Sequence, residues 1–330
     1  TNNNKKWATQ QCEDPKFETQ GGFYSRNFNL KFSRPKAGEI IYYTENGDEP
    51  TKASKQYNHN VGISINKTTV IRAVAMADDK LPGNIISATF FLNTKDFDLP
   101  VVSFITAPKN LTDNTIGIYV RGSNGIPGNG TDQPANWNQD WWRPANFELY
   151  DQSKINHLNQ ELDISIAGGW SRTMFPQKSL KITPRKKHGD NRLRYDFFPQ
   201  VKPNHKYQGV LLRNSGNDFP LTMLRDGFMQ TLIMGRLDID YQAYQPAVCF
   251  INGQYYGIQN LRERSNKHLI FSNYGHKEED IYVLDQGTIQ YEPFRSVVNY
   301  VQGRDLSQTR LYDAVKEMID VENLIDYYIA

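Results

Sequence analysis

The chain has 330 residues, with 38 Lys and Arg against 36 Asp and Glu, which gives a net charge of +2. This near balance excludes the strongly basic field of a dedicated nucleic-acid-binding protein. The content of 38% apolar and 12% aromatic residues excludes a disordered chain. No run of 18 apolar residues occurs, so the sequence predicts no membrane span, and the length favours two domains.

The first 18 residues are polar and are interpreted as a linker or tail. The chain begins at Thr1 without an initiator Met or a signal-peptide pattern, so we expect a processed or trimmed product. The two cysteines, Cys12 and Cys249, lie far apart, and we expect them to be unpaired, with Cys249 a buried apolar residue. The histidines show no metal-ligand spacing.

Residues 19–95 show only β signals. Alternating apolar residues from Phe28 to Phe32 and strand-like runs at 39–44, 69–75 and 88–91 are separated by Gly, Asn and Pro. Short strands at such regular spacing predict a small all-β sandwich.

Residues 96–330 are assigned to a second domain, which begins with strand-like residues 101–104. The following long segment, residues 121–140, is rich in Gly and Asn and is interpreted as a mobile surface loop, a candidate lid or binding loop. Trp137, Trp141 and Trp142 could stack a sugar or a base, although anchoring in the core is the favoured interpretation. Further strands are predicted at residues 145–150, 162–166 and 178–183.

The last of these strands begins with a lysine that needs explaining. Lys178, Leu180 and Ile182 share one face of the strand, so the lysine points the same way as two aliphatic residues. A buried ammonium is costly unless it is paired. The ordinary explanation is an ion pair, or a stem lying along the sheet with its head in water. The alternative is a site for an anionic ligand such as a nucleotide phosphate.

The remaining elements include one mixed helix and one hairpin. After a strand at 210–213, Asp218 is a predicted N-cap for a helix that ends near Gly235. Its expected apolar face consists of Leu221, Leu224, Phe228 and Leu232. Asn252-Gly253 between residues 247–251 and 254–258 predicts a type I′ hairpin. Ser265 is expected to cap a short helix, helices are predicted at 307–319 and 322–330, and the basic run at 185–187 is interpreted as a solvated loop.

The order of these parts is that of a kinase-like N-lobe: strand, glycine-containing loop, strand with an inward lysine, helix with an acid, and hairpin. In that arrangement the lysine steadies the nucleotide phosphates and the helix carboxylate orients the lysine. Phosphoryl transfer depends on positioning and electrostatics, so Lys178 would supply the cation and Asp226 its partner.

Two families are resembled, in sequence order. Residues 22–24, 41–44, 47–51 and 71–75 resemble the chitobiase/β-hexosaminidase C-terminal-type sandwich, an accessory module of secreted bacterial proteins. That resemblance implies an extracytoplasmic bacterial protein, either secreted or at the cell surface, and no catalytic role for the sandwich. From about Leu99 to the end the chain resembles the spore coat protein H (CotH) kinase family. The matching segments are residues 99–103, 117–120, 168–172, 176–180, 212–214 with Asp218, 224–226, 251–258 and 261–263.

The second resemblance implies an atypical kinase that uses ATP and Mg²⁺ or Mn²⁺ to phosphorylate serine or threonine of a protein substrate. Carried over by position, Lys178 is the phosphate-binding lysine and Asp226 the helix acid. Glu263 would lie near the lobe junction. The other residues expected at the cofactor are the cleft cations Arg213 and Arg225 and the loop residues Gly168, Gly169 and Arg172.

One departure from the family pattern concerns catalysis. The family places its catalytic aspartate in an Asn-x-Asp-Trp…Asn-Asn segment and its metal-binding aspartate in a following Asp-x-Asp, both after a helix like residues 323–329. We therefore expect these aspartates beyond Ala330, and expect this polypeptide alone to be inactive. Asp238 and Asp240 form an Asp-x-Asp, but they are interpreted as loop residues at a helix end.

The fold class expected from these arguments is multidomain: an all-β sandwich followed by an α+β kinase-like N-lobe whose C-lobe is truncated. Three functions are kept open. The first is the N-terminal part of a secreted CotH-like kinase. The second is a non-catalytic surface protein that binds glycan or protein through the sandwich or Trp137, Trp141 and Trp142, and the third is a structural coat or envelope protein. An internal ion-pair network is the plain alternative for the roles of Lys178, Asp226, Arg213 and Glu263.

Overall fold

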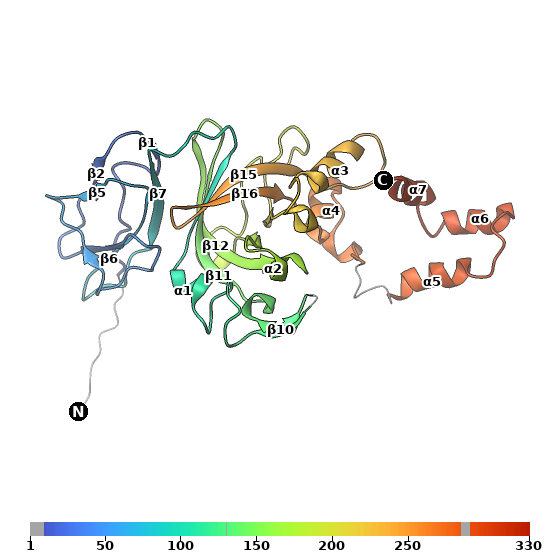
Figure 1. The fold of residues 1–330 in the computed structure, drawn as a ribbon, viewed down its shortest axis with the longest axis horizontal. Coiled ribbons are helices and arrows are strands. Elements are labelled where there is room, and N and C mark those ends of the chain that lie inside the picture. The colour runs from blue at the N-terminus through green and yellow to red at the C-terminus, as the bar shows by residue number, and fades with distance from the viewer. Residues whose placement is uncertain (1–9, 130, 285–290) are drawn as a thin grey trace, which may run out of the picture.

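The computed structural model describes residues 10–129, 131–284 and 291–330. Three parts follow one another from left to right in Figure 1: a β-rich N-terminal domain, a β-barrel, and an arm of helices at the C-terminal end. Residues 1–9 of the expected tail and Gly130 of the long glycine-rich segment lie outside the described residues. The two described cysteines, Cys12 and Cys249, are both buried and free, as expected.

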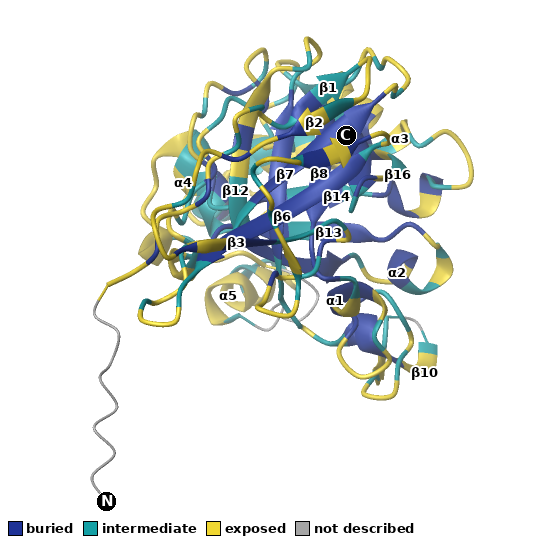
Figure 2. Cartoon of the chain, turned by 90° about the vertical axis from the view of Figure 1, so that its left-hand side faces the viewer, coloured by how far each residue is buried: buried dark blue, intermediate teal, exposed yellow. Residues whose placement is uncertain are grey.

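The N-terminal domain is built from two sheets around one apolar core. The larger sheet has the order β1 (Gly22–Tyr24), β7 (Ile86–Leu92), β6 (Thr69–Met76), β3 (Ile40–Thr44) and β4 (Lys55–Gln56), and the smaller pairs β2 (Phe28–Leu30) with β5 (Ile63–Ile65). Leu30, Phe32, Ile41, Ile71 and Phe90 are among the side chains that fill the space between them. The dark blue of β6 and β7 in Figure 2 shows how completely these strands are buried.

Residues 10–18, which the sequence assigns to a linker, pack on this domain. Cys12 donates its backbone N–H to the carbonyl of Leu81, and Phe17 bridges to Phe32. The rings of Phe17 and Phe32 lie 4.9 Å apart. The first sheet domain therefore begins earlier than the strand pattern indicated.

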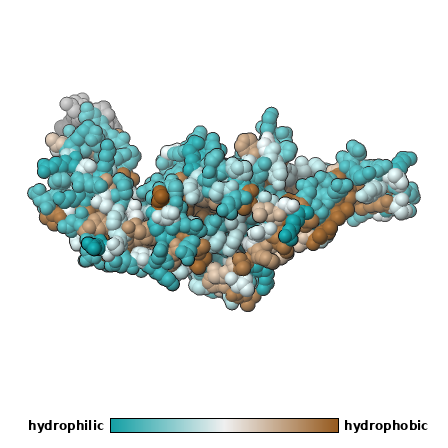
Figure 3. Space-filling view, turned by 90° about the horizontal axis from the view of Figure 1, so that it is seen from above, coloured by the Kyte–Doolittle hydropathy of each residue, from teal (hydrophilic) through white to brown (hydrophobic). Residues whose placement is uncertain are grey.

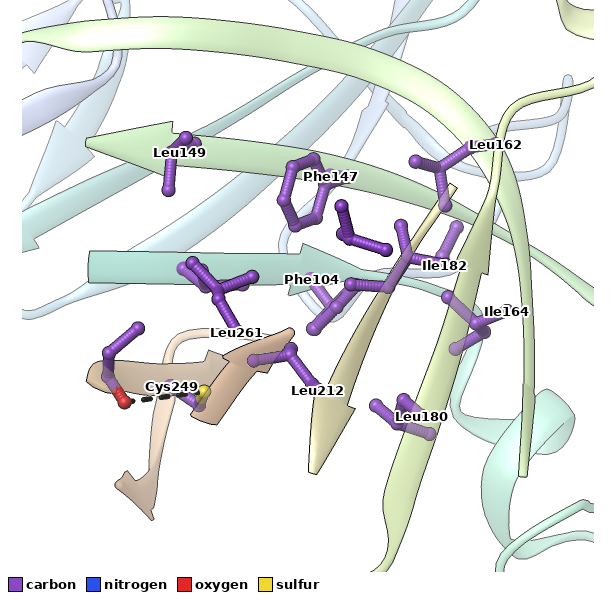
Figure 4. Packing of buried hydrophobic residues seen from close by; sticks show 14 of the residues in the cluster. Phe104, Phe147, Leu149, Leu162, Ile164, Leu180, Ile182, Leu212, Cys249 and Leu261 are labelled. Atoms are coloured by element: carbon purple, nitrogen blue, oxygen red, sulfur yellow. Dashed lines mark hydrogen bonds between the residues drawn. The ribbon is translucent and has the colours of Figure 1, made fainter. Parts of the chain in front are cut away.

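The second part is a closed seven-stranded barrel. Its strands follow the order β11 (Arg143–Tyr150), β12 (Asn156–Ala167), β13 (Ser179–Thr183), β14 (Val210–Arg213), β16 (Gln254–Arg262), β15 (Tyr244–Ile251) and β8 (Val101–Ile105). Neighbouring strands of the barrel are antiparallel, except that β15 and β8 run parallel. Phe104, Phe147, Ile164, Ile182 and Leu261 point into the barrel from different strands, as Figure 4 shows.

The kinase-like N-lobe expected from the order of elements is not confirmed. The strands at 145–150, 162–166, 179–183 and 210–213 exist, and the hairpin turns at Asn252 (φ 49°) and Gly253 (φ 76°), as a type I′ turn requires. The strand patterns did not predict that the sheet closes into a barrel. Closure requires β8 to pair with β15, which is about 150 residues away in sequence. Barrel closure depends on strand tilt and stagger, which local alternation does not encode.

The segment expected to be a mobile loop is partly folded. Residues Ile126–Gly128 (β9) and Thr131–Ala135 (β10) pair as a small ribbon, followed by a 3₁₀ turn at Asn136–Asn138. Asn136 is fully buried and donates its side-chain amide to the carbonyls of Asn114 and Gly117. The amide anchors the segment to the connection that follows α1, which composition alone did not indicate.

The helices are short. They are α1 (Pro108–Thr112), α2 (Ser171–Met174), α3 (Arg225–Ile233), α4 (Lys267–Tyr274), α5 (Glu292–Val301), α6 (Thr309–Lys316) and α7 (Val321–Ile329). Helices α2, α3 and α4 lie on the side of the barrel away from the sandwich, and α5, α6 and α7 form the arm. Helix α4 is capped by Asn266 instead of Ser265. Helices α1, α2 and α5 were not expected, and no helix in the described ranges is long and apolar enough to cross a membrane.

The predicted apolar face of the mixed helix does not enter the core. Leu221, Leu224, Phe228 and Leu232 are 64%, 51%, 54% and 40% exposed. Helix α3 starts only at Arg225 and packs against the barrel through Gly227, where an added Cβ would lie 2.6 Å from the ring of Tyr244. A glycine allows this close approach, so the face opposite the predicted stripe is the buried one.

The arm formed by α5, α6 and α7 presents further apolar side chains to solvent. Phe294, Tyr312, Ile325 and Ile329 are each exposed by more than one third. Figure 3 shows hydrophobic residues in brown along the right-hand arm.

The sandwich and the barrel share a packed junction. Phe91 of β7, Val101 of β8, Tyr150 of β11 and Phe250 of β15 form one buried apolar cluster that spans both parts. Beside it, Glu148 is fully buried and accepts hydrogen bonds from the backbone N–H of Thr89 at 3.0 Å and the hydroxyl of Tyr150 at 3.1 Å.

Candidate functional site

A cleft of about 410 Å³ opens where the glycine-containing loop, the end of β14 and helix α3 meet. It is lined by residues 168–171, Arg213, residues 215–218, Arg225, Asp226 and Met229. The loop follows β12 and the 215–218 turn follows β14, so the cleft lies at one end of two barrel strands. Five of the eight residues expected at a cofactor line it: Gly168, Gly169, Arg213, Arg225 and Asp226.

Asp218 fixes the wall of this cleft that leads into helix α3. Its carboxylate accepts from the hydroxyl of Thr222 at 2.6 Å and from the backbone N–H of Arg225 at 2.9 Å. These hydrogen bonds, with the Thr222 hydroxyl bond first, lower the pKa of Asp218 to about 2. Asp218 is not the N-cap that the sequence predicted, because α3 begins at Arg225 with Leu224 in the N-cap position. Its carboxylate still accepts from the backbone N–H of the first helical residue, seven positions later.

Asp226 lies at the centre of an ion-pair cluster in the cleft floor. Its Oδ2 atom is 2.8 Å from Nε of Arg213 and 2.6 Å from Nη1 of Arg262. Arg262 is fully buried, and its Nη2 donates to the side chain of Gln242 at 3.0 Å. A buried guanidinium requires such a partner. The carboxylate of Asp226 is therefore already ion-paired with two arginines.

Lys178 is buried, as its position on the strand predicted, but it does not contact Asp226. Its side chain is 4% exposed, and its ammonium donates to the carbonyls of Arg172 at 2.6 Å and Phe175 at 3.3 Å. The ammonium lies 4.1 Å from the centre of the Trp137 ring. No carboxylate in the described part of the chain forms an ion pair with it. Burial, reinforced by the charge of Arg172, therefore lowers the pKa of Lys178 to about 8.

The backbone of Lys178 is held as firmly as its side chain. Its N–H donates to the hydroxyl oxygens of Tyr119 at 2.7 Å and Tyr256 at 3.0 Å, and its carbonyl accepts from the amide of Gln259 at 2.8 Å. Sequence reasoning missed these three partners. In the sequence these partners are ordinary polar side chains near predicted strands. Such residues are too common to identify a site.

Two predicted residues lie outside the cleft lining. Arg172 is buried and donates to the carbonyls of Gly168 and Trp137, which ties the glycine-containing loop to the 3₁₀ turn at Asn136–Asn138. Glu263 accepts from the backbone N–H of Ala243 at 3.0 Å and pairs with Lys202 at 3.1 Å. Both residues hold the scaffold in this structure.

The tryptophans proposed for stacking have their faces covered by cations. Trp137 is 8% exposed beneath Lys178, Trp141 lies under Arg143 at 5.0 Å, and Trp142 lies under Arg185 at 4.6 Å. Core anchoring, the favoured interpretation, matches Trp137.

No cluster of three or more His, Cys, Asp or Glu side chains suited to a metal occurs among the described residues. The carboxylates near the cleft are already used, Asp218 by the start of α3 and Asp226 by two arginines. Asp240 accepts from Tyr274 at 3.0 Å, and Asp238 donates its N–H to Asp326. We therefore assign no metal ligand to these residues.

A β-sandwich joined to a barrel with an arginine-flanked cleft defines a two-domain, mostly β protein. Comparison with family models identifies both parts in this order. The model described as CotH kinase protein matches residues 164–330, slightly more than half of the chain, and the chain belongs to this family. The model described as chitobiase/beta-hexosaminidase C-terminal domain matches residues 19–87. No curated protein matches the chain significantly.

Proposed function

We propose that this chain provides the nucleotide-binding part of a CotH-like kinase that transfers the γ-phosphate of ATP, with Mg²⁺ or Mn²⁺, to serine or threonine of proteins outside the cytoplasm. The proposal divides the chain into a sandwich of residues 19–95 and a kinase-like region from residue 96. The observation that carries it is the cleft in which Gly168, Gly169, Arg213 and Arg225 converge within a member of the CotH family.

The chemistry of the cleft suits a phosphate chain. Arg225 is 63% exposed by side chain and borders the cleft, so its guanidinium is accessible to an anion. Arg213 also lines the cleft and is one third exposed, with its Nε atom 2.8 Å from Asp226. The glycines leave the backbone accessible, and guanidinium groups bind phosphate oxygens in a planar, two-pronged fashion. ATP supplies the transferable phosphoryl group, while these residues bind and orient it.

In this proposal the counterparts of a kinase N-lobe are β12, the glycine-containing loop, β13, α3 and the β15–β16 hairpin. Lys178 would have to leave the carbonyls of Arg172 and Phe175 to reach a phosphate. The lowered pKa indicates that its present surroundings favour the charged ammonium less than water does. A phosphate would be a stronger acceptor than two neutral carbonyls.

Binding of Mg·ATP, measured by isothermal titration calorimetry, tests the proposal because it needs only the cleft. Arg225→Gln and Lys178→Met should each raise the Kd about tenfold or more, since one charge-assisted hydrogen bond contributes about 1.5–3 kcal/mol. Arg236→Gln is the matched control, because Arg236 is exposed and does not line the cleft. Absence of Mg·ATP binding, or equal affinity in all variants, contradicts the proposal.

A further inference from the structure

Beside the apolar junction cluster, part of the outer surface of the barrel that faces the sandwich is polar. Asn146 is paired with Glu161 across β11 and β12, and Glu148 with Asn159. Alternation along each strand places these four side chains on one face, opposite the core residues Phe147 and Leu162. Sheets packed face to face usually bury apolar side chains between them, so this amide- and carboxylate-rich face requires another explanation.

The junction with the sandwich accounts for part of it. Glu148 binds Thr89, the amide of Asn159 donates to the carbonyl of Ser87 at 2.9 Å, and Glu161 pairs with Arg72 at 2.9 Å. Asn146, Asn159 and Glu161 also line a cleft of about 1170 Å³ between sandwich and barrel, far larger than the cleft beside helix α3.

The lining of this cleft includes a buried hydrogen-bond acceptor without a partner among the described residues. Asn146 lines the cleft and is 3% exposed. Its Nδ2 donates to Asn159 at 2.7 Å, but its Oδ1 has no hydrogen-bond partner among the described residues. A buried polar atom without a partner is costly. A ligand hydroxyl that reaches the floor after a small rotation of the amide would satisfy it.

The charges around the cleft do not favour an ion of either sign, because the two exposed lining charges without an ion pair among the described residues, Lys16 and Glu49, are opposite. Arg72 is neutralised by Glu161, and Lys187 by Asp163 at 2.8 Å. Gln160 donates from Nε2 to the carbonyl of Asp190 at 2.8 Å, and Nε2 of His188 lies 2.8 Å from Asp163. Oε1 of Gln160 and Nδ1 of His188 therefore remain for a ligand, with the half-buried ring of Phe17. Amide and imidazole groups offer neutral donors and acceptors, and an aromatic ring offers a flat apolar surface.

We propose that the cleft between sandwich and barrel binds a neutral, polyhydroxylated chain, that is, an oligosaccharide. Its hydroxyl groups match the paired donors and acceptors of the amides, and its apolar ring faces match Phe17. The volume exceeds the 300–1,000 Å³ or so of an ordinary small-molecule pocket, which favours a ligand of several sugar units. This site is separate from the tryptophans and independent of nucleotide binding.

The test is calorimetric titration of the protein with four soluble hexasaccharides, derived from cellulose, chitin, mannan and xylan. At least one should bind saturably. Asn84→Trp places a large ring into the cleft from an exposed position, and His188→Ala removes a polar group from the opposite wall. We expect the first to abolish binding and the second to weaken it about fivefold or more, as expected for one lost hydrogen bond.

Asn60→Trp is the matched control, since Asn60 is equally exposed on the sandwich but does not line the cleft. It should bind like the unmodified chain, and circular dichroism melting should show all three variants folded. The proposal is overturned if none of the hexasaccharides binds, or if binding is the same in Asn84→Trp and Asn60→Trp. Neither result bears on Mg·ATP binding at the other cleft.

Discussion

Arg262 donates from Nη1 to Oδ2 of Asp226 over 2.6 Å, and this pair joins the last strand of the barrel to helix α3. The kinase-like order of elements predicted Asp226 as the partner of Lys178. In the structure its carboxylate instead neutralises the fully buried guanidinium of Arg262. The carboxylate is a structural requirement of the cleft floor, whatever the cleft binds.

Asp226→Asn should destabilise the protein by about 3–5 kcal/mol, because it leaves the charge of Arg262 buried without compensation. Urea unfolding followed by circular dichroism measures the loss. The double variant Asp226→Asn/Arg262→Met removes both charges and should recover much of the stability. A single variant within about 0.5 kcal/mol of the parent, the usual spread for neutral surface changes, would show that the pair does not stabilise the fold.

Lys178 predicts a dependence of stability on alkaline pH. Its folded pKa of about 8 lies below the ordinary value of 10.5. Between these values the unfolded chain holds a proton that the folded chain has lost, so stability attributable to this group rises with pH across that window. Lys178→Met should lack this component. The measurement is the difference in unfolding free energy between parent and variant from pH 8 to 10.5, and a constant difference contradicts the assignment.

Glu148 predicts the opposite trend near neutrality. Burial raises its pKa from 4.5 to about 7, despite hydrogen bonds from Thr89 and Tyr150. Above pH 4.5 the unfolded carboxyl ionises while the folded one stays protonated, so stability falls as pH rises to about 7, by about 3 kcal/mol at 1.36 kcal/mol for each pKa unit. Glu148→Gln, which keeps the shape without the charge, should flatten this part of the pH–stability curve. An unchanged slope in the variant would assign the effect elsewhere.

We expect Gly47→Ala to lower the thermal stability much more than Gly38→Ala. At Gly47 (φ +91°) a Cβ would lie 2.5 Å from both the carbonyl oxygen of Thr106 and Oδ1 of Asn252. That carbonyl accepts from Nδ2 of Asn252, and that Oδ1 accepts from the backbone N–H of Thr106. At Gly38 (φ +83°) nothing lies within 4 Å. Both replacements carry the backbone strain of a left-handed residue, so the extra loss of thermal stability in Gly47→Ala isolates the clash. Equal losses would show that the junction yields easily.

The sequence predicts elements well where a local pattern determines them. The hairpin at Asn252 and Gly253, the strand ending at Arg213 and the inward side chain of Lys178 follow from alternation and turn chemistry. The partners of these residues follow from tertiary packing. Lys178 meets carbonyls instead of Asp226 because the loop before it forms a short helix, α2, whose end faces the ammonium. Nothing in the spacing of Lys178 and Asp226 encodes that turn.

The polar cleft between sandwich and barrel was missed for a related reason. Asn146, Asn159 and Glu161 are unremarkable polar positions of two strands, and they become a surface only when the barrel closes and the sandwich is placed beside it. Leu221 and Phe228 were assigned to one apolar helix face, and both are exposed in the structure. Periodicity identifies an apolar stripe but not whether another element covers it.

The shared cluster of Phe91, Val101, Tyr150 and Phe250 has a consequence for how this protein can be dissected. A fragment starting at residue 96 would present Val101, Tyr150 and Phe250 to water, along with the carboxyl of Glu148 that the backbone of Thr89 otherwise covers. Such a fragment should aggregate or melt early, and exchanging the sandwich for an unrelated module should fail in the same way. We therefore expect the two parts, although they match different family models, to fold only when they are expressed as one polypeptide.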